Sequence, residues 1–254
     1  MESANFFNSI VAGIIQGVSE LFPVSSSGHL ILFSHLTNLN LEIADIAILH
    51  LGTLLAIIVG MWDKIKEIKA IKTLLKIVIS TIPGVIVGFL VQDYVDEYLS
   101  ANWIIATSLL FWGIVMIIVD QISKKKEFKT TEISQVSTFQ AIVVGLGQVI
   151  AFIPGTSRSG IATIAGIVSG IKPKIAVEYG FLAGLILIPG KGVLSLIQGI
   201  EIDVSAFLIG LATIVSATIG YIVIQVFRTY IDKRILTCCG VYRILLGAVI
   251  LLFF

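Results

Sequence analysis

Two serine-rich polar segments interrupt a chain that otherwise consists of long apolar runs. The first reads QGVSELFPVSSSGH over residues 16–29, and the second reads PGTSRSG over residues 154–160. A carboxylate, an imidazole and a guanidinium are costly to bury among apolar helices, so such residues usually face one another or a water-filled cavity. The two segments therefore predict a functional site that the fold has to shelter from lipid.

The apolar runs indicate an integral membrane protein. Hydrophobic residues make up 57% of the chain and charged residues only 13%, whereas roughly a quarter of the residues of a soluble domain are charged. Six runs are long enough to cross roughly 30 Å of hydrocarbon. They cover residues 44–61, 73–91, 102–119, 175–197, 204–226 and 236–254. The net charge of +1 argues against a nucleic-acid partner, which requires a cluster of basic residues on one face.

The loops between these runs alternate in charge. Three of them are rich in Lys and Arg, namely 62–76, 120–137 and 227–235, whereas 92–101 and 198–205 contain neither residue. Because Lys and Arg accumulate in cytoplasmic loops, the basic loops are expected inside and the acidic loops outside. This alternation is kept only if the broken stretches 6–41 and 139–171 each enter and leave on one face, so both are predicted to be re-entrant helical hairpins.

An internal repeat supports the same organisation. The string IVAGIIQ, which ends at Gln16, matches IVVGLGQ, which ends at Gln148, and Ser25-Ser26-Ser27-Gly28 matches Ser157-Arg158-Ser159-Gly160 at the same offset of 132 residues. The halves cover about 1–120 and 138–254, and a basic cytoplasmic linker at 121–137 joins them. Each half holds one hairpin and three spans. An odd number of crossings inverts the second copy. The fold class predicted is an all-α integral membrane protein of six transmembrane helices and two re-entrant helical hairpins, a single membrane domain over 1–254 with an inverted-topology repeat and both termini outside.

The second segment has the features of a phosphate cradle. The helix is expected to stop before Pro154 and to restart among Thr156, Ser157 and Ser159, which favour helix N-caps. Free N–H groups and the positive end of the helix dipole attract an anion there, and Arg158 adds a planar fork suited to phosphate oxygens. Gly155 and Gly160 belong to the same cradle. The alternative is structural, with Arg158 pairing a carboxylate to hold two helices together.

The first segment offers two kinds of chemistry. Gln16 and Glu20 are four residues apart on one helix face, and three serines and His29 follow. A serine beside an imidazole and a carboxylate has the groups needed for nucleophilic attack at phosphorus, with His29 or Glu20 relaying the proton. Alternatively, Gln16 and Glu20 supply oxygen ligands for Mg²⁺ or Ca²⁺. The structural alternative is a hydrogen-bonded Glu20–His29 pair at a helix break.

The two segments resemble the signature motifs of the undecaprenyl-pyrophosphate phosphatase family, the bacitracin-resistance phosphatases. The match continues through DIAILHLGTLLAIIVGMW and YRILLG and covers essentially the whole chain. The resemblance implies a plasma-membrane enzyme that removes the terminal phosphate of a C55 isoprenyl diphosphate with a divalent cation, Mg²⁺ or Ca²⁺, and so recycles the lipid carrier of cell-wall synthesis. Oligomeric state is left open, with a homodimer among the alternatives.

The resemblance also implies roles for single residues. It places the proposed nucleophile on Ser26, the histidine on His29, the phosphate-binding arginine on Arg158 and the paired acidic motif on Gln16 and Glu20. Gln16 departs from the glutamate of many members, and a neutral amide is no base and a weaker metal ligand. Substrate contacts are expected from serines and small residues of both segments: Ser25, Ser27, Gly155, Thr156, Ser157, Ser159 and Gly160.

Two other functions use the same features. Inverted repeats with broken helices are a transporter architecture, so a flippase for a polyprenyl phosphate is the alternative, and an inactive lipid-binding scaffold is a third possibility. The presence of Ser26, Glu20 and His29 favours the enzyme. The remaining ionisable residues within the spans are interpreted as structural pairs or as side chains that reach the interface; they are His50, Glu178, Lys191 and Arg243.

Overall fold

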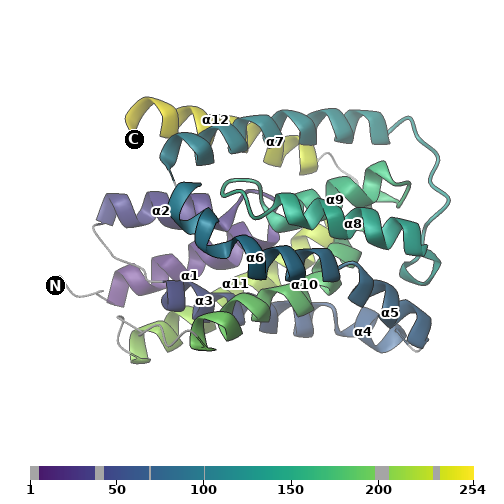
Figure 1. Ribbon diagram of the computed structural model, residues 1–254, viewed down its shortest axis with the longest axis horizontal. Coiled ribbons are helices and arrows are strands. Elements are labelled where there is room, and N and C mark those ends of the chain that lie inside the picture. Colours follow the sequence, from purple (N-terminus) through teal and green to yellow (C-terminus); the bar gives the residue numbers. More distant parts are fainter. Residues whose placement is uncertain (1–5, 38–42, 69, 100, 198–205, 231–234) are drawn as a thin grey trace.

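The computed structural model describes residues 6–37, 43–68, 70–99, 101–197, 206–230 and 235–254, and within them the regular structure is helical (Figure 1). One isolated parallel bridge joins Thr130 to Ile171. The helices are α1 (Phe6–Leu21), α2 (Ser26–Thr37), α3 (Ile43–Gly60), α4 (Trp62–Glu67), α5 (Ile71–Ile79), α6 (Ile82–Tyr98), α7 (Asn102–Ser123), the 3₁₀ turn η1 (Ile133–Gln135), α8 (Thr138–Ile150), α9 (Arg158–Val168), α10 (Pro173–Ile197), α11 (Ala206–Tyr230) and α12 (Ile235–Phe253).

The chain is a multi-pass membrane protein. Of the residues described, four helical segments are both long and apolar enough to cross a membrane, and these are Ile71–Val91, Asn102–Ser123, Phe207–Tyr230 and Ile235–Phe253. Shorter apolar helices include α1, α8 and α9. The all-helical prediction is therefore confirmed. Six crossings with two re-entrant hairpins stay a prediction, because length and composition alone do not decide them.

One predicted run differs from its expected form. Residues 73–91 were expected to be continuous, but α5 ends at Ile79 and α6 begins at Ile82. Pro83 lies in the first turn of α6 and cannot donate a backbone hydrogen bond to the preceding turn. Gln148 Nε2 donates instead to the Ser80 carbonyl, at 2.8 Å. A side chain from α8 therefore satisfies the carbonyl group at the break.

Small residues let the long helices approach closely. α12 packs along α7, while α11 packs against both α1 and α3. A Cβ atom on Gly113 of α7 would lie 2.8 Å from the Gly240 carbonyl oxygen of α12, and one on Gly17 of α1 would lie 2.8 Å from the Ser216 carbonyl oxygen of α11. Because such distances exclude any side chain, glycine at these positions sets how near the helices lie.

Two pairs of short helices place the polar segments at the centre of the molecule. In Figure 1 the pair α1–α2 lies toward the left and the pair α8–α9 toward the right. α1 begins at Phe6 and α8 at Thr138, and α2 begins at Ser26 and α9 at Arg158. Both offsets are 132 residues, the spacing of the sequence repeat. The same local sequence thus forms the same helix–turn–helix unit twice.

Candidate active site

The two turns share an uncommon backbone conformation. Ser25 and Ser157 have φ angles of 75° and 73°, and they are the positive-φ non-glycine residues of the described chain. Each serine hydroxyl accepts from the backbone N–H three residues on, Gly28 at 3.4 Å and Gly160 at 3.3 Å. Left-handed backbone at a non-glycine residue is costly and occurs mainly at functional sites. Each turn therefore starts a helix whose N-terminal N–H groups can attract an anion.

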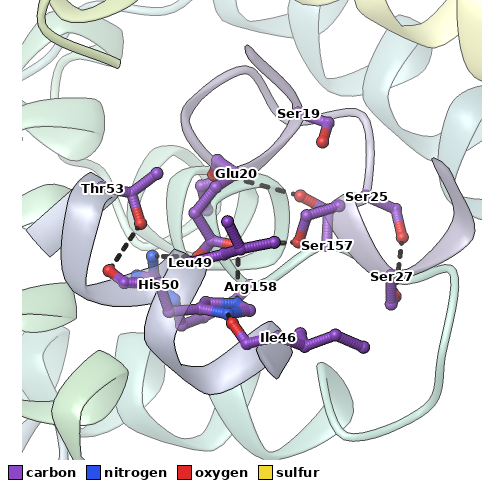
Figure 2. A network of polar contacts seen from close by, with 12 residues as sticks. Ser19, Glu20, Ser25, Ser27, Ile46, Leu49, His50, Thr53, Ser157 and Arg158 are labelled. Carbon is purple, nitrogen blue, oxygen red and sulfur yellow. Dashed lines mark hydrogen bonds and ion pairs between the residues drawn. The ribbon is translucent and has the colours of Figure 1, made fainter. Parts of the chain in front are cut away.

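Glu20 is the point at which the two segments meet. Ser26 Oγ donates to Glu20 Oε2 at 2.7 Å, and Arg158 Nη2 donates to Glu20 Oε1 at 2.9 Å. Glu20 is only 7% exposed. Figure 2 shows Arg158 pointing toward Glu20. The structure thus brings together the hydroxyl of Ser26 in α2, the carboxylate of Glu20 in α1 and the guanidinium of Arg158 in α9. Glu20 and Arg158 are 138 residues apart in sequence.

His50 of α3 also belongs to this cluster, although the sequence interpretation gave it only a structural role. Its Nε2 lies 3.3 Å from Glu20 Oε2, and its Nδ1 donates to the Ile46 carbonyl at 2.7 Å (Figure 2). The signal that could have identified it is a histidine inside an apolar run, which by default marks a functional site.

His29 forms its hydrogen bonds away from Ser26, although the expected role of proton relay requires contact with that serine. Its Nδ1 donates to the Ser25 carbonyl at 2.7 Å, and its Nε2 lies 2.7 Å from the Tyr242 hydroxyl. The two rings stack with centroids 5.6 Å apart. Both ring nitrogens are therefore engaged away from Ser26, and His29 ties α2 to α12. Glu20, rather than His29, accepts the hydrogen bond of the Ser26 hydroxyl.

The other residues expected to bind substrate divide into two groups. Ser27 is exposed, and Ser157 is half-buried. The buried ones contact protein: Ser159 Oγ donates to the Glu20 carbonyl at 2.9 Å, and the Thr156 hydroxyl lies 3.0 Å from that of Ser108. Ser25, Gly155 and Gly160 are buried as well. These contacts hold the turns in place, and the substrate contacts expected from these residues stay a prediction.

A glycine of α10 makes room for Arg158. A Cβ atom on Gly184 would lie 2.6 Å from Arg158 Nη1. The same Nη1 makes a long contact of 3.4 Å with the Gly180 carbonyl. The guanidinium therefore lies over the backbone of α10 with one edge turned to Glu20, and it is about 15% exposed.

The residues present fit a divalent cation in part. Gln16 is fully buried, and among the described residues neither its amide oxygen nor its amide nitrogen has a hydrogen-bond partner. An unsatisfied buried amide oxygen one helical turn from a carboxylate suits a hard cation. The described residues contain no group of three or more His, Cys, Asp or Glu side chains placed to hold a metal. Such a cation would take its other ligands from water and substrate phosphate, as Mg²⁺ usually does.

The other ionisable residues of the spans differ in their hydrogen-bond partners. Glu178 accepts from Arg228 Nε at 3.2 Å, and Arg228 also pairs with Asp63 at 2.6 Å. Glu178 and Arg228 thus form an ion pair. The Lys191 side chain lies outside what the structure describes. Arg243 is fully buried against backbone carbonyls of both turns.

Comparisons with known proteins show the family of this chain. A family model described as "Bacitracin resistance protein BacA" matches residues 9–249. The undecaprenyl-diphosphatase of Thermosipho africanus is 38% identical and covers 90% of this chain and 92% of its own length. Undecaprenyl-diphosphatase 1 of Clostridioides difficile is 33% identical and covers 98% of this chain and 96% of its own length. The undecaprenyl-diphosphatase of Caldicellulosiruptor bescii is 35% identical and covers 98% of this chain and 97% of its own length.

Proposed function

Because the chain belongs to the bacitracin resistance protein family BacA, we propose that it hydrolyses undecaprenyl diphosphate to the monophosphate and inorganic phosphate. The observation that carries this proposal is the meeting of Ser26 and Arg158 on the Glu20 carboxylate. A hydroxyl with a base at 2.7 Å is an activated nucleophile, and a guanidinium beside it can bind the phosphoryl group under attack. The flippase alternative is not favoured, since a carrier needs no such nucleophile and base.

The geometry supports a two-step mechanism. Arg158 and the N-terminal N–H groups of α2 and α9 bind the terminal phosphate. Ser26 Oγ attacks its phosphorus, Glu20 takes the Ser26 proton and passes it to solvent or to the leaving group, and the bridging P–O bond breaks as the polyprenyl monophosphate leaves with the electron pair. Water then attacks the phosphoserine and loses a proton to Glu20. Glu20 returns that proton to Ser26 Oγ as inorganic phosphate departs.

The function is tested by phosphate release from purified protein in detergent, with farnesyl diphosphate and a longer isoprenyl diphosphate as substrates. We expect inorganic phosphate to appear in a one-to-one ratio with the isoprenyl monophosphate. A protein that releases none from either lipid, but moves a polyprenyl phosphate between the leaflets of a vesicle, is a flippase instead.

We propose Mg²⁺ or Ca²⁺ as the cofactor, held by Gln16 and Glu20 together with phosphate oxygens, where it would offset charge on the transferring phosphoryl group. Glutamate at position 16 would add a charged ligand in place of the unpartnered amide. We therefore expect Gln16→Glu to lower the dissociation constant for the cation about tenfold, measured by calorimetry without substrate and by the cation concentration for half-maximal activity. An unchanged constant, or full wild-type activity in chelator, contradicts the metal assignment.

The proposed topology has six crossings by α3, α5–α6, α7, α10, α11 and α12, with α1–α2 and α8–α9 as hairpins that enter the plasma membrane from opposite faces. The charge of the loops supports it and places both termini outside; the homodimer stays a prediction.

Single cysteines at Lys125 and at Asp96, in a background with Cys238 and Cys239 replaced by serine, test this topology. We expect an impermeant thiol reagent to label intact cells at position 96 and not at position 125. Permeabilised cells, labelled at both positions, are the control, and labelling of intact cells at position 125 reverses the orientation.

A further inference from the structure

One arginine outside both polar segments joins the two turns. Arg243 of α12 is 0% exposed. Its Nη1 donates to the Pro23 carbonyl at 3.0 Å, and its Nη2 donates to the carbonyls of Gly155 at 2.7 Å and Thr156 at 3.0 Å. A single planar guanidinium thus bonds the backbone of both turns at once.

The carbonyls that it bonds occupy matching places in the two halves. Pro23 lies three residues before Ser26, where α2 begins, and Gly155 lies three residues before Arg158, where α9 begins. Pro23 and Gly155 are themselves 132 positions apart, the repeat spacing. Arg243 therefore lies between equivalent points of the two turns. A shift of one turn against the other changes the distance between Ser26 and Arg158.

Close helix packing fixes where Arg243 lies. Gly240 and Gly247 stand three residues before it and four after it, on the same face of α12. A Cβ atom on Gly240 would lie 2.6 Å from the Gly113 carbonyl oxygen, and one on Gly247 would lie 2.8 Å from the Ala106 carbonyl oxygen. Backbone contact on both sides holds α12 in register with α7, so the arginine between these contacts is held against the turns.

The positive charge of Arg243 has no carboxylate partner within the described part of the chain. Arg158 pairs there with Glu20, and Arg228 pairs with Asp63 and Glu178. The hydrogen bonds of Arg243 go to neutral carbonyls, and its Nε has no hydrogen-bond partner among the described residues. A buried charge without a counter-charge is costly, and in membrane proteins such residues mark functional sites. A bound anion at the turns would supply the missing negative charge.

We propose that Arg243 is a positioning residue, which holds the two turns in the register where Ser26 and Arg158 act on one phosphoryl group, and whose unpaired charge strengthens diphosphate binding. This inference rests on the proposed phosphatase function. It assigns a role to the YRILLG segment, in which neighbouring Tyr242 holds His29.

Two substitutions separate the roles of geometry and charge. Arg243→Lys keeps the charge but replaces the fork by one ammonium group, so we expect kcat to fall roughly 10- to 100-fold with KM within about threefold of wild type. Arg243→Gln also removes the charge, so we expect a similar fall in kcat and a rise in KM of about tenfold.

Arg228→Lys is the matched control, because it makes the same exchange in an arginine that bonds Asp63, Glu178 and the Gly60 carbonyl. We expect this control to change the melting temperature but to leave kcat and KM within about twofold. Melting temperature and gel filtration in detergent are measured for every variant.

The outcomes separate this inference from the proposed function. Wild-type kcat in both folded Arg243 variants overturns the positioning role, and an unchanged KM in Arg243→Gln overturns the electrostatic one. Failure of both variants to fold makes the residue purely structural and overturns the inference as well. If the wild-type protein releases no phosphate, the phosphatase function fails. The role of Arg243 is then decided by the rise in melting temperature that inorganic pyrophosphate causes, measured for the wild-type protein and for Arg243→Gln. Loss of that rise in Arg243→Gln supports the inference, and an equal rise overturns it.

Discussion

Ser26→Ala should lower turnover at least a thousandfold, because it removes the hydroxyl that, in the described part of the chain, donates to the Glu20 carboxylate at 2.7 Å. Loss of a nucleophile leaves only the rate enhancement that comes from binding and charge stabilisation, as mutants of other nucleophilic enzymes show on the order of 10³-fold or more. KM should change little, since Arg158 and the helix N-termini still bind the phosphate.

The measurement is phosphate release from an isoprenyl diphosphate, together with trapping of phosphoserine by rapid acid quench. Ser169→Ala is the matched control, because the hydroxyl of this serine donates to the Gly166 carbonyl at the far end of α9, at 2.8 Å. We expect the control to keep turnover within about twofold. Near-normal turnover in Ser26→Ala would shift the attack to Ser27 or to water, since Ser25 is buried at the cap of α2.

Arg158→Lys should lower kcat/KM roughly 100-fold. Lysine keeps the charge but not the planar fork, so it cannot hold a phosphate oxygen and Glu20 Oε1 together. Loss of one charge-assisted hydrogen bond to a transition state costs about 2–3 kcal/mol, which corresponds to this factor. Phosphate release measured over a range of substrate concentrations gives the value.

Gly184→Ala tests the same arginine without changing it. A methyl group there would lie 2.6 Å from Arg158 Nη1 and push the guanidinium away from α10. We expect kcat/KM to fall about tenfold while the charge of the site is kept. Gly210→Ala is the control, because a Cβ atom at Gly210 has no atom of the described residues within 4 Å outside its own stretch of helix. Full activity in both Arg158→Lys and Gly184→Ala would contradict the phosphate-binding role.

The contact with Glu20 makes the two interpretations of Arg158, as a phosphate ligand and as a helix-joining ion pair, compatible with each other. The sequence allowed either a phosphate ligand or a helix-joining ion pair, and in the structure Arg158 pairs with Glu20 across two turns. The pair places a guanidinium next to the nucleophile, so the structural contact and the proposed chemistry use the same atoms. His50, also on Glu20, is the part of this cluster that its sequence context did not reveal.

The sequence by itself determined most of the helices and the two turns. Apolar runs mark the helices because each run has to bury its side chains in lipid or protein, and Pro, Ser and Gly mark the turns because they cap or stop helices. The spacing of 132 residues appears unchanged in the starts of α2 and α9 and in the conformations of Ser25 and Ser157. These are local properties, which a few neighbouring residues decide.

Only the tertiary structure decided which polar groups meet. His29 was expected beside Ser26, yet it bonds Tyr242, 213 residues away in sequence, while His50 reaches Glu20. Arg243 reaches both turns from the last helix. These contacts depend on how closely α12 approaches α7 and α11 approaches α1, which backbone contacts at Gly240 and Gly17 set. Helical periodicity fixes the face on which a side chain lies but not the partner opposite it, because that partner comes from the packing of distant helices.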